Sequence, residues 1–536
     1  MKKTVKLFAG CAFSLLLSTA VPAQSLPADQ PDLVLINRLR DEALNRSRVQ
    51  DYLTALTDDI GPRLTGSPAL AVAANWAQAE LRRTGLQNVH TESFAPFGRS
   101  WTLQHASLRV TVPAALDVAM IPKAWTPGTN GVQHGAAIVA KIGSEAEFAL
   151  WAGKLRGKIV LLDEVRVMKP HLTADAQRYS DGELNELGHT DPDVEPGTKR
   201  PDRQTYLKQQ QFRHRLLQFL SEEGVIAVLH VSRGDDGTIF VQGGGSYKKG
   251  EAAGPPDLMV SANVYNRLYR LLEKKIPVEL DIDVKVSVGE EDPAAAVSVL
   301  ADIPGSDKKD EIVMLGAHLD SWHGGTGATD NAAGVAAMME AVRLLKVSGF
   351  QPRRTIRIAL WGGEEQGLLG SRAYVKQWVA DRPVPDDEKE LPSWLRSNRQ
   401  PLQLKALHDK ISAYYNLDNG SGRIRGVYAE NNVAAKALFD TWLQPFHDLG
   451  ATTVSLRNTG STDHVSFDSV GVPGFQFIQD KLDYMSRTHH SNMDVYDKVQ
   501  KNDLAQAALI IASFVAQTAN REQLLPRKPL PPPAPD

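Results

Sequence analysis

From about residue 295 onward, the chain alternates between short apolar runs and helical segments. The run 312–315 is continuously apolar, which is typical of a strand that is buried on both faces of a sheet. Segment 355–360 is a second strand candidate, and 413–415 and 475–478 are two more. Between the first two, apolar residues recur at helical spacing over 334–346. This alternation predicts an α/β fold with a doubly wound, mostly parallel sheet.

Side chains that can bind metals follow these predicted strands. His318 comes after the first strand, Glu364 and Glu365 follow the second, and Asp418 follows the third. The carboxyl ends of parallel strands share one rim of a sheet, and ligands bind in the crevice there. Asp330 lies just before the predicted helix, so it can cap that helix or reach the same rim.

Together with His490, these residues offer two imidazoles and several carboxylates, which is a ligand set for a pair of zinc ions. His318 and Asp418 can bind one ion, Glu365 and His490 can bind the other, and Asp330 can bridge the two. Each residue alone has an ordinary explanation, such as a helix cap or a turn. Their joint placement at strand ends favours a hydrolase over a binding protein.

Two acidic residues remain for other roles. Glu364 cannot bind the same ion from the same position as its neighbour Glu365, so it is the candidate general base. Asp320 stands two residues after His318 and is a candidate acceptor that orients the imidazole.

Residues 128–288 have a different sequence pattern. Strand candidates at 136–139, 158–162 and 225–229 alternate with loops rich in Gly, Pro and Asp, and 278–284 alternates apolar and acidic residues. This segment predicts a mostly β module without a cluster of ligand residues. Ahead of it, residues 24–127 include a helix that Ser67 and Pro68 open as N-cap and first helical residue.

The first 23 residues predict a signal peptide, with three lysines, an apolar stretch and small residues before the cleavage site. Cys11 is the only cysteine, so the processed chain would contain no disulfide. Export without disulfides favours a bacterial periplasmic or secreted enzyme. No later stretch is apolar enough to predict a membrane span, so we expect no membrane contact after cleavage.

Composition narrows the choice of partners. A hydrophobic content of 42% and a charged content of 23% are typical of a globular protein. The formal net charge of −3 makes nucleic acid an unfavourable partner. Residues 523–536 are rich in proline and predict a disordered tail.

Five blocks of the chain closely resemble the zinc exopeptidases of peptidase family M28. They are His318-Leu319-Asp320-Ser321, Gly327-Ala328-Thr329-Asp330-Asn331-Ala332-Ala333-Gly334, Glu364-Glu365-Gln366-Gly367-Leu368-Leu369-Gly370-Ser371, Asn416-Leu417-Asp418 and His490-Ser491-Asn492-Met493-Asp494. Segment 128–288 resembles a protease-associated domain. Short stretches near residues 45, 61–67 and 85–90 resemble the plasma glutamate carboxypeptidase subgroup.

The resemblance implies a peptidase with two zinc ions per chain, peptide substrates and a phosphorylase/hydrolase-like catalytic domain at 289–522, to which residues 24–127 also belong. It implies the ligands His318, Asp330, Glu365, Asp418 and His490. His490 is preferred over His489 because it stands four residues before Asp494, as in the family. Asp463-His464 is expected near the substrate pocket, without an assigned role.

Several alternatives remain open from the sequence. Aminopeptidase, dipeptidase and carboxypeptidase activities all fit, as does the single-zinc acyl transfer of glutaminyl cyclases, which share this fold. The number of bound metal ions would separate the last alternative. A non-catalytic binding protein on a peptidase scaffold should have lost ligands, and none is lost here. Peptidase family M20 has a similar metal set but a different context around its bridging aspartate. The oligomeric state is not predicted.

Overall fold

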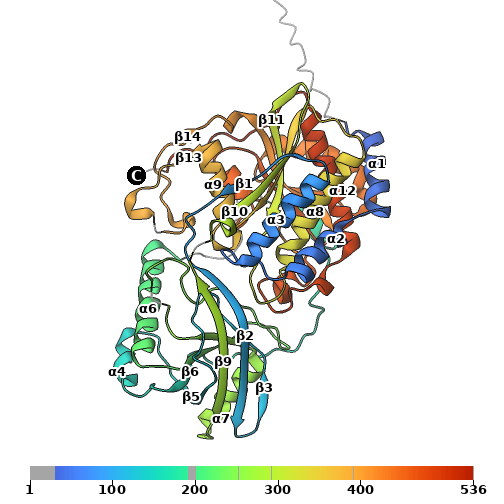
Figure 1. Ribbon diagram of the computed structural model, residues 1–536. Helices are drawn as coiled ribbons and strands as arrows, with labels where there is room; N and C mark the ends of the chain where they lie inside the picture. Colours follow the sequence, from blue (N-terminus) through green and yellow to red (C-terminus); the bar gives the residue numbers. More distant parts are fainter. Residues whose placement is uncertain (1–29, 191–200, 252, 291, 390, 535–536) are drawn as a thin grey trace, which may run out of the picture.

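The computed structural model describes residues 30–190, 201–251, 253–290, 292–389 and 391–534, so the predicted signal peptide with Cys11 lies outside the described residues. Two eight-stranded sheets, one above the other in Figure 1, organise these segments. No helix in the described ranges combines the length and the apolar character that crossing a bilayer requires.

The first sheet carries the predicted strand ends. Its order is β1 (Gln87–Ser93), β10 (Val297–Ile303), β12 (Arg354–Trp361), β11 (Lys308–His318), β15 (Ile411–Asn416), β18 (Gly474–Gln479), β16 (Ile424–Tyr428) and β17 (Thr453–Ser455). The four central strands β12, β11, β15 and β18 are parallel, and β16 pairs with β17 in parallel. The pairs β1–β10, β10–β12 and β16–β18 are antiparallel.

The sheet is therefore mixed, whereas the sequence predicts a mostly parallel one. One reason is the short turn 304–307, which reverses the chain between β10 and β11. A crossover of that length cannot join parallel strands.

Helices cover both faces of this sheet. The helices α1 (Leu33–Asn45), α3 (Pro68–Arg83), α8 (Ala333–Val347) and α12 (Lys501–Asn520) lie on one face, and α9 (Leu369–Tyr374) and α11 (His464–Asp468) lie on the other. Strand β11 points Val313 and Leu315 into the first core, and Ile312 and Met314 into the second. This explains the continuous apolar run. Helix α3 begins as predicted, because the Ser67 hydroxyl accepts a hydrogen bond from Leu70 N.

The second sheet has the order β3 (Leu116–Val118), β2 (Ser100–Val112), β9 (Glu279–Gly289), β5 (Gln133–Val139), β6 (Lys158–Leu161), β7 (Ala227–Val231), β8 (Asp257–Val260) and β4 (Met120–Pro122). Helix α7 (Ala262–Glu273) packs on one face, and α6 (Arg203–Glu222) on the other. This sheet starts at Ser100, ahead of the module boundary expected at residue 128.

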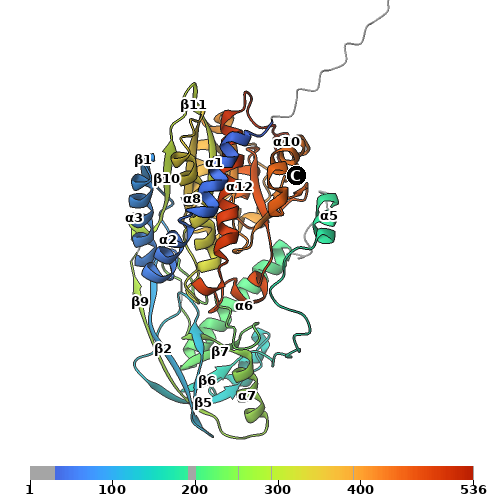
Figure 2. The same cartoon turned by 90° about the vertical axis from the view of Figure 1, so that its right-hand side faces the viewer.

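One helix in the chain between β6 and β7 packs away from the second sheet. Helix α5 (Asp181–His189) lies beside the edge of the first sheet (Figure 2), where Ser455 Oγ donates a hydrogen bond of 2.7 Å to Leu187 O. Just before it, Arg178 forms ion pairs of 2.7 Å with the buried carboxylates of Asp480 and Asp503. The segment between β6 and β7 therefore contacts the first sheet unit through α5 and Arg178.

The end of the chain also differs from the prediction. Residues 521–534 have no regular secondary structure, yet they pack on the first sheet instead of forming a disordered tail. Leu525 is buried. Arg527 donates hydrogen bonds of 2.7 Å to His408 O and Ile411 O, and Lys528 contacts Asp468. The proline-rich composition predicted disorder because composition does not reveal tertiary contacts. Here Arg527 and Lys528 bind groups of the first sheet unit that are distant in sequence.

Candidate metal centre

The structure brings the predicted ligand residues to one rim. His318 is the last residue of β11, Glu364 and Glu365 follow β12, and Asp418 follows β15. Asp330 lies in the turn that leads into α8. His490, from the segment after β18, reaches the same place.

Asp330 stands between two groups of side chains. Its Oδ1 lies 3.2 Å from His318 Nε2, which is also 3.3 Å from Asp418 Oδ1. Its Oδ2 lies 3.1 Å from His490 Nε2, which is also 3.0 Å from Glu365 Oε2. Each oxygen of one carboxylate thus faces its own histidine and its own second carboxylate, which is the arrangement expected of a bridging ligand.

The donor set fits a pair of divalent cations. Glu365 Oε1 is buried without a hydrogen-bond partner, and buried polar atoms in folded proteins are otherwise nearly always paired. Three buried carboxylates this close repel one another unless positive charge compensates them. Imidazole nitrogens combined with carboxylate oxygens are the ligands that zinc prefers.

The pKa values of these groups reflect the same crowding. Burial, more than any other cause, raises the pKa of Glu365 to about 7. Burial also acts to raise the pKa of Asp330, but hydrogen bonds from His318 and His490 outweigh it and hold that pKa well below its usual range.

Asp320 connects the two strand ends. Its carboxylate accepts hydrogen bonds of 3.2 Å from the backbone N–H groups of Glu364 and Glu365. It also accepts a bond of 2.8 Å from Thr65 Oγ1. The Nδ1 of His318 lies 3.0 Å from the backbone carbonyl of Asp320 and 3.7 Å from its carboxylate, so the backbone is the nearer acceptor.

Glu364 is buried beside the ligands and is not part of either group. The glycines on both sides of its turn, Gly363 and Gly367, have positive φ angles of 72° and 109°. Such backbone suits glycine and turns the chain sharply after β12. Burial raises the pKa of Glu364 well above its usual range, and neighbouring Asp418 and Asp463 act in the same direction.

Asp494 stabilises the loop that carries Asp330 through hydrogen bonds to Thr329. This buried carboxylate accepts bonds of 2.6 Å from Thr329 N and 2.8 Å from Thr329 Oγ1. Burial raises the pKa of Asp494 to about 7. From the sequence, Asp494 served only to identify His490 by its spacing, and no structural role was predicted for it.

Arg63 is a supporting residue that the sequence did not single out. Its buried guanidinium donates hydrogen bonds of 2.8–2.9 Å to the carbonyls of Leu56, Gly61, Leu319, Thr326 and Gly327. Burial lowers its pKa to about 10, so it stays charged at neutral pH. Arg63 thereby ties the loop after His318 to the loop before Asp330. The turn-rich loop around Arg63 was visible in the sequence, but its partners come from distant segments.

His489 and His490 lie stacked, with ring centroids 3.6 Å apart. His489 Nε2 is 3.9 Å from Asp330 Oδ2, which is farther than the 3.1 Å of His490. Burial lowers the pKa of His489 to about 4. The shorter distance to Asp330, together with the contact to Glu365, makes His490 the better candidate ligand.

Asp463 and His464 are both fully buried near the centre. Neither carboxylate oxygen of Asp463 has a hydrogen-bond partner, and burial raises its pKa to about 7. His464 Nε2 contacts Thr459 Oγ1 at 3.0 Å and Glu430 Oε1 at 3.4 Å.

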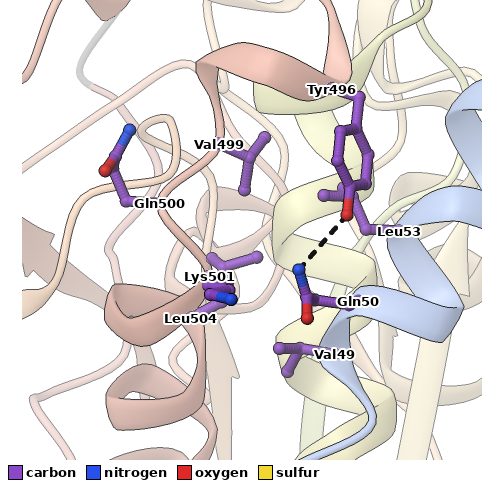
Figure 3. A pocket seen from close by; sticks show the side chains of 8 residues that line it. All are labelled: Val49, Gln50, Leu53, Tyr496, Val499, Gln500, Lys501 and Leu504. Atoms are coloured by element: carbon purple, nitrogen blue, oxygen red, sulfur yellow. Dashed lines mark hydrogen bonds between the residues drawn. The ribbon is translucent and has the colours of Figure 1, made fainter.

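A separate cavity of about 290 Å³ lies between α2 (Val49–Thr54) and the start of α12 (Figure 3). Gln50 Nε2 donates a hydrogen bond of 3.3 Å to Tyr496 Oη inside it. Its lining contains no histidine and no carboxylate, so it lacks the groups that metal-dependent hydrolysis requires.

The sheet and the rim of buried histidines and carboxylates define a metal-dependent hydrolase. Comparison with known proteins agrees. The sequence model of peptidase family M28 matches residues 298–515. Carboxypeptidase Q from Rattus norvegicus is 25% identical over 486 residues, which cover 90% of this chain and 87% of that protein.

Two solved structures extend the comparison. A peptidase M28 precursor from Shewanella amazonensis SB2B has a TM-score of 0.64 and 25% identity, covering 93% of this chain and 98% of that one. A zinc aminopeptidase from Bacillus subtilis, at 17% identity and a TM-score of 0.53, covers 89% of this chain and 96% of that one and shares the fold. Residues 298–515 therefore form a peptidase M28 domain, and the chain is a zinc metallopeptidase whose substrates are peptides.

Proposed function

We propose that this chain is an exopeptidase that cleaves dipeptides or short peptides at a pair of zinc ions. His318 and Asp418 would hold one ion, Glu365 and His490 the other, and Asp330 would bridge them. The observation that carries the proposal is that the two oxygens of Asp330 face two different histidines, at 3.2 and 3.1 Å. A site for a single ion would need only one of the two histidine–carboxylate pairs beside Asp330.

Zinc, when bound, acts as a Lewis acid on the scissile carbonyl and lowers the pKa of a water molecule. Glu364 accepts the proton of the attacking water and returns it to the leaving nitrogen. Burial raises the pKa of Glu364, and a carboxylate with a raised pKa is a stronger proton acceptor. Asp320 fixes the backbone of Glu364 and Glu365, so base and ligand keep a constant separation.

We further propose that the second sheet is a protease-associated insertion and that residues 1–23 direct export to the periplasm or outside the cell. The sequence resemblance supports both statements. The similarity to a carboxypeptidase Q and to an M28 precursor covers 90% and 93% of this chain, so it extends over the segment of the second sheet as well.

The variant Glu364→Gln tests the assignment of the base. Gln keeps the size of the side chain and cannot accept the proton, so we expect wild-type zinc content and a kcat lower by about 10²–10⁴-fold. Zinc content and hydrolysis of unblocked dipeptides are measured on the same samples. Glu186→Gln, on the exposed face of α5, is the matched control and should behave as wild type. Wild-type turnover by zinc-loaded Glu364→Gln would exclude Glu364 as the base.

A further inference from the structure

One loop of the second sheet contacts the segment that carries His490. Segment 232–245, between β7 and β8, lies against the segment that carries His490. Val241 N donates a hydrogen bond of 2.8 Å to His490 O, and Phe240 forms a β-bridge with Ser491. Asn492 Oδ1 accepts a bond of 2.7 Å from Ile239 N. We call this contact zone, residues 232–245 with 487–492, the seam.

Most charges along the seam are paired. Arg487 forms ion pairs of 2.6 Å with Asp175 and 3.0 Å with Asp236. Arg166 lies 3.3 Å from Asp235. The carboxylates that approach the seam from the second sheet therefore already have cations.

Arg233 differs from its neighbours. Arg233 is exposed, and its guanidinium carbon lies 4.0 Å from the centre of the Phe240 ring, a cation–π contact that orients the side chain. In the described part of the chain, no carboxylate lies within the 4.0 Å of an ion pair with Arg233. Phe240 pairs with Ser491, the residue after His490, so the guanidinium stacked on Phe240 belongs to the strip of chain that lies against the metal-ligand segment.

A second donor without a partner lies against the same segment. Trp322 is only 7% exposed, and its indole N–H has no hydrogen-bond partner. Its ring packs edge-on against His490, with centroids 6.0 Å apart. A buried N–H without an acceptor is unfavourable unless a ligand supplies one.

We propose that Arg233 binds the free α-carboxylate of the peptide substrate, with Trp322 Nε1 as a second donor. This inference rests on the proposed exopeptidase function and deepens it, because it assigns the end of the peptide that the site recognises. The guanidinium fork matches a carboxylate in shape and charge. Recognition of a free amine at the seam would need an unpaired carboxylate there, and Asp175, Asp235 and Asp236 are paired. The preferred substrates are therefore dipeptides and short peptides with an unblocked C-terminus.

The test uses zinc-loaded full-length protein and a panel of unblocked dipeptides, each also as the C-terminal amide and as the N-acetyl form. Wild type should cleave the free acids at least about tenfold better than the amides, since a hydrogen bond to a charged group contributes 1.5–3 kcal/mol. In Arg233→Gln, kcat/KM for the free acids should fall about 10–100-fold, mainly through KM, while kcat/KM for the amides stays unchanged.

Two further variants complete the design. Arg233→Lys keeps the charge and should recover part of the loss. Arg215→Gln, an exposed arginine on α6, removes the same charge elsewhere on the second sheet unit and should match wild type. Equal effects of Arg233→Gln on acids and amides, or no effect, would overturn the assignment of Arg233.

The outcomes also separate the two proposals. If zinc-loaded wild type cleaves none of the panel, the exopeptidase function fails. If it cleaves amides as well as free acids, the function stands and only the role of Arg233 is refuted.

Discussion

At the scale of single residues, Asp320 joins the two strand ends that form the centre. Its carboxylate accepts bonds from Glu364 N, Glu365 N and Thr65 Oγ1. In Asp320→Asn, the amide –NH₂ would face these donors. We expect zinc affinity or turnover to fall about 10–100-fold, as is typical when the partners of metal ligands are removed.

Zinc titration and dipeptide kinetics would measure this effect. Thr65→Ser, which keeps the hydroxyl donor, is the control and should change little. Wild-type zinc affinity together with wild-type turnover in Asp320→Asn would show that Asp320 does not hold the centre in place.

Arg63 acts at the same scale on stability. It is fully buried and satisfies five backbone carbonyls. Arg63→Met leaves the carbonyls of Gly61, Leu319 and Thr326 without a donor among the described residues, whereas Leu56 O and Gly327 O keep a backbone donor. Each buried unsatisfied group costs about 1–3 kcal/mol. We expect the free energy of unfolding to drop by about 3 kcal/mol or more, as measured by urea denaturation.

Arg83→Met, on the exposed end of α3, is the matched control and should lie within about 0.5 kcal/mol of wild type. If Arg63→Met were as stable as this control, the proposed tie between the two ligand loops would be wrong.

At the scale of elements, the seam connects the second sheet to His490. Asn492 accepts a bond from Ile239 N at 2.7 Å, and its own N–H donates one of 3.0 Å to Ile239 O. Asn492→Ala removes the side-chain acceptor. We expect a loss of about 1–2 kcal/mol in stability and a higher zinc dissociation constant, because the His490 segment becomes less constrained.

Thermal unfolding and zinc competition assays would measure both quantities. Asn185→Ala, on exposed α5, is the control. An effect on stability with unchanged zinc affinity would mean that the seam supports the fold without supporting the metal centre.

The sequence predicted the central strands well because each carries a strong local pattern. The run 312–315 is apolar on both faces since β11 is buried between two cores. The outer strands β10, β16 and β17 and the antiparallel pairs were not predicted, because their pairing depends on contacts between distant segments. The packed C-terminal segment was missed for the same reason.

The same division applies to the centre. Predicted ligands such as His318 and Asp418 were visible because parallel topology places strand ends together. Arg63 and Arg233 were not visible as functional candidates. A lone arginine in a loop has no sequence signature, and its role appears only when the partners around it, or their absence, are known.

At the scale of the whole molecule, zinc binding is coupled to pH. Burial alone would lower the pKa of His490, but Glu365 and Asp330 outweigh this and raise it to about 10 in the metal-free protein. His490 is therefore protonated at pH 7, whereas zinc binds neutral imidazole. Zinc binding should release protons, and zinc affinity should weaken as the pH falls.

Calorimetric titration in two buffers of different ionisation enthalpy would measure the released protons. The enthalpy should vary with the buffer in the direction of proton release. An enthalpy that is independent of the buffer would contradict the proposed protonation of the metal-free centre.

The central claim is that Asp330 bridges two zinc ions that act together on a peptide bond. The most direct measurement adds zinc stepwise to metal-free protein and records bound zinc and dipeptide hydrolysis together. We predict saturation at two zinc ions per chain, with full turnover only when both are bound. Saturation of binding and of activity at one ion per chain would contradict the claim.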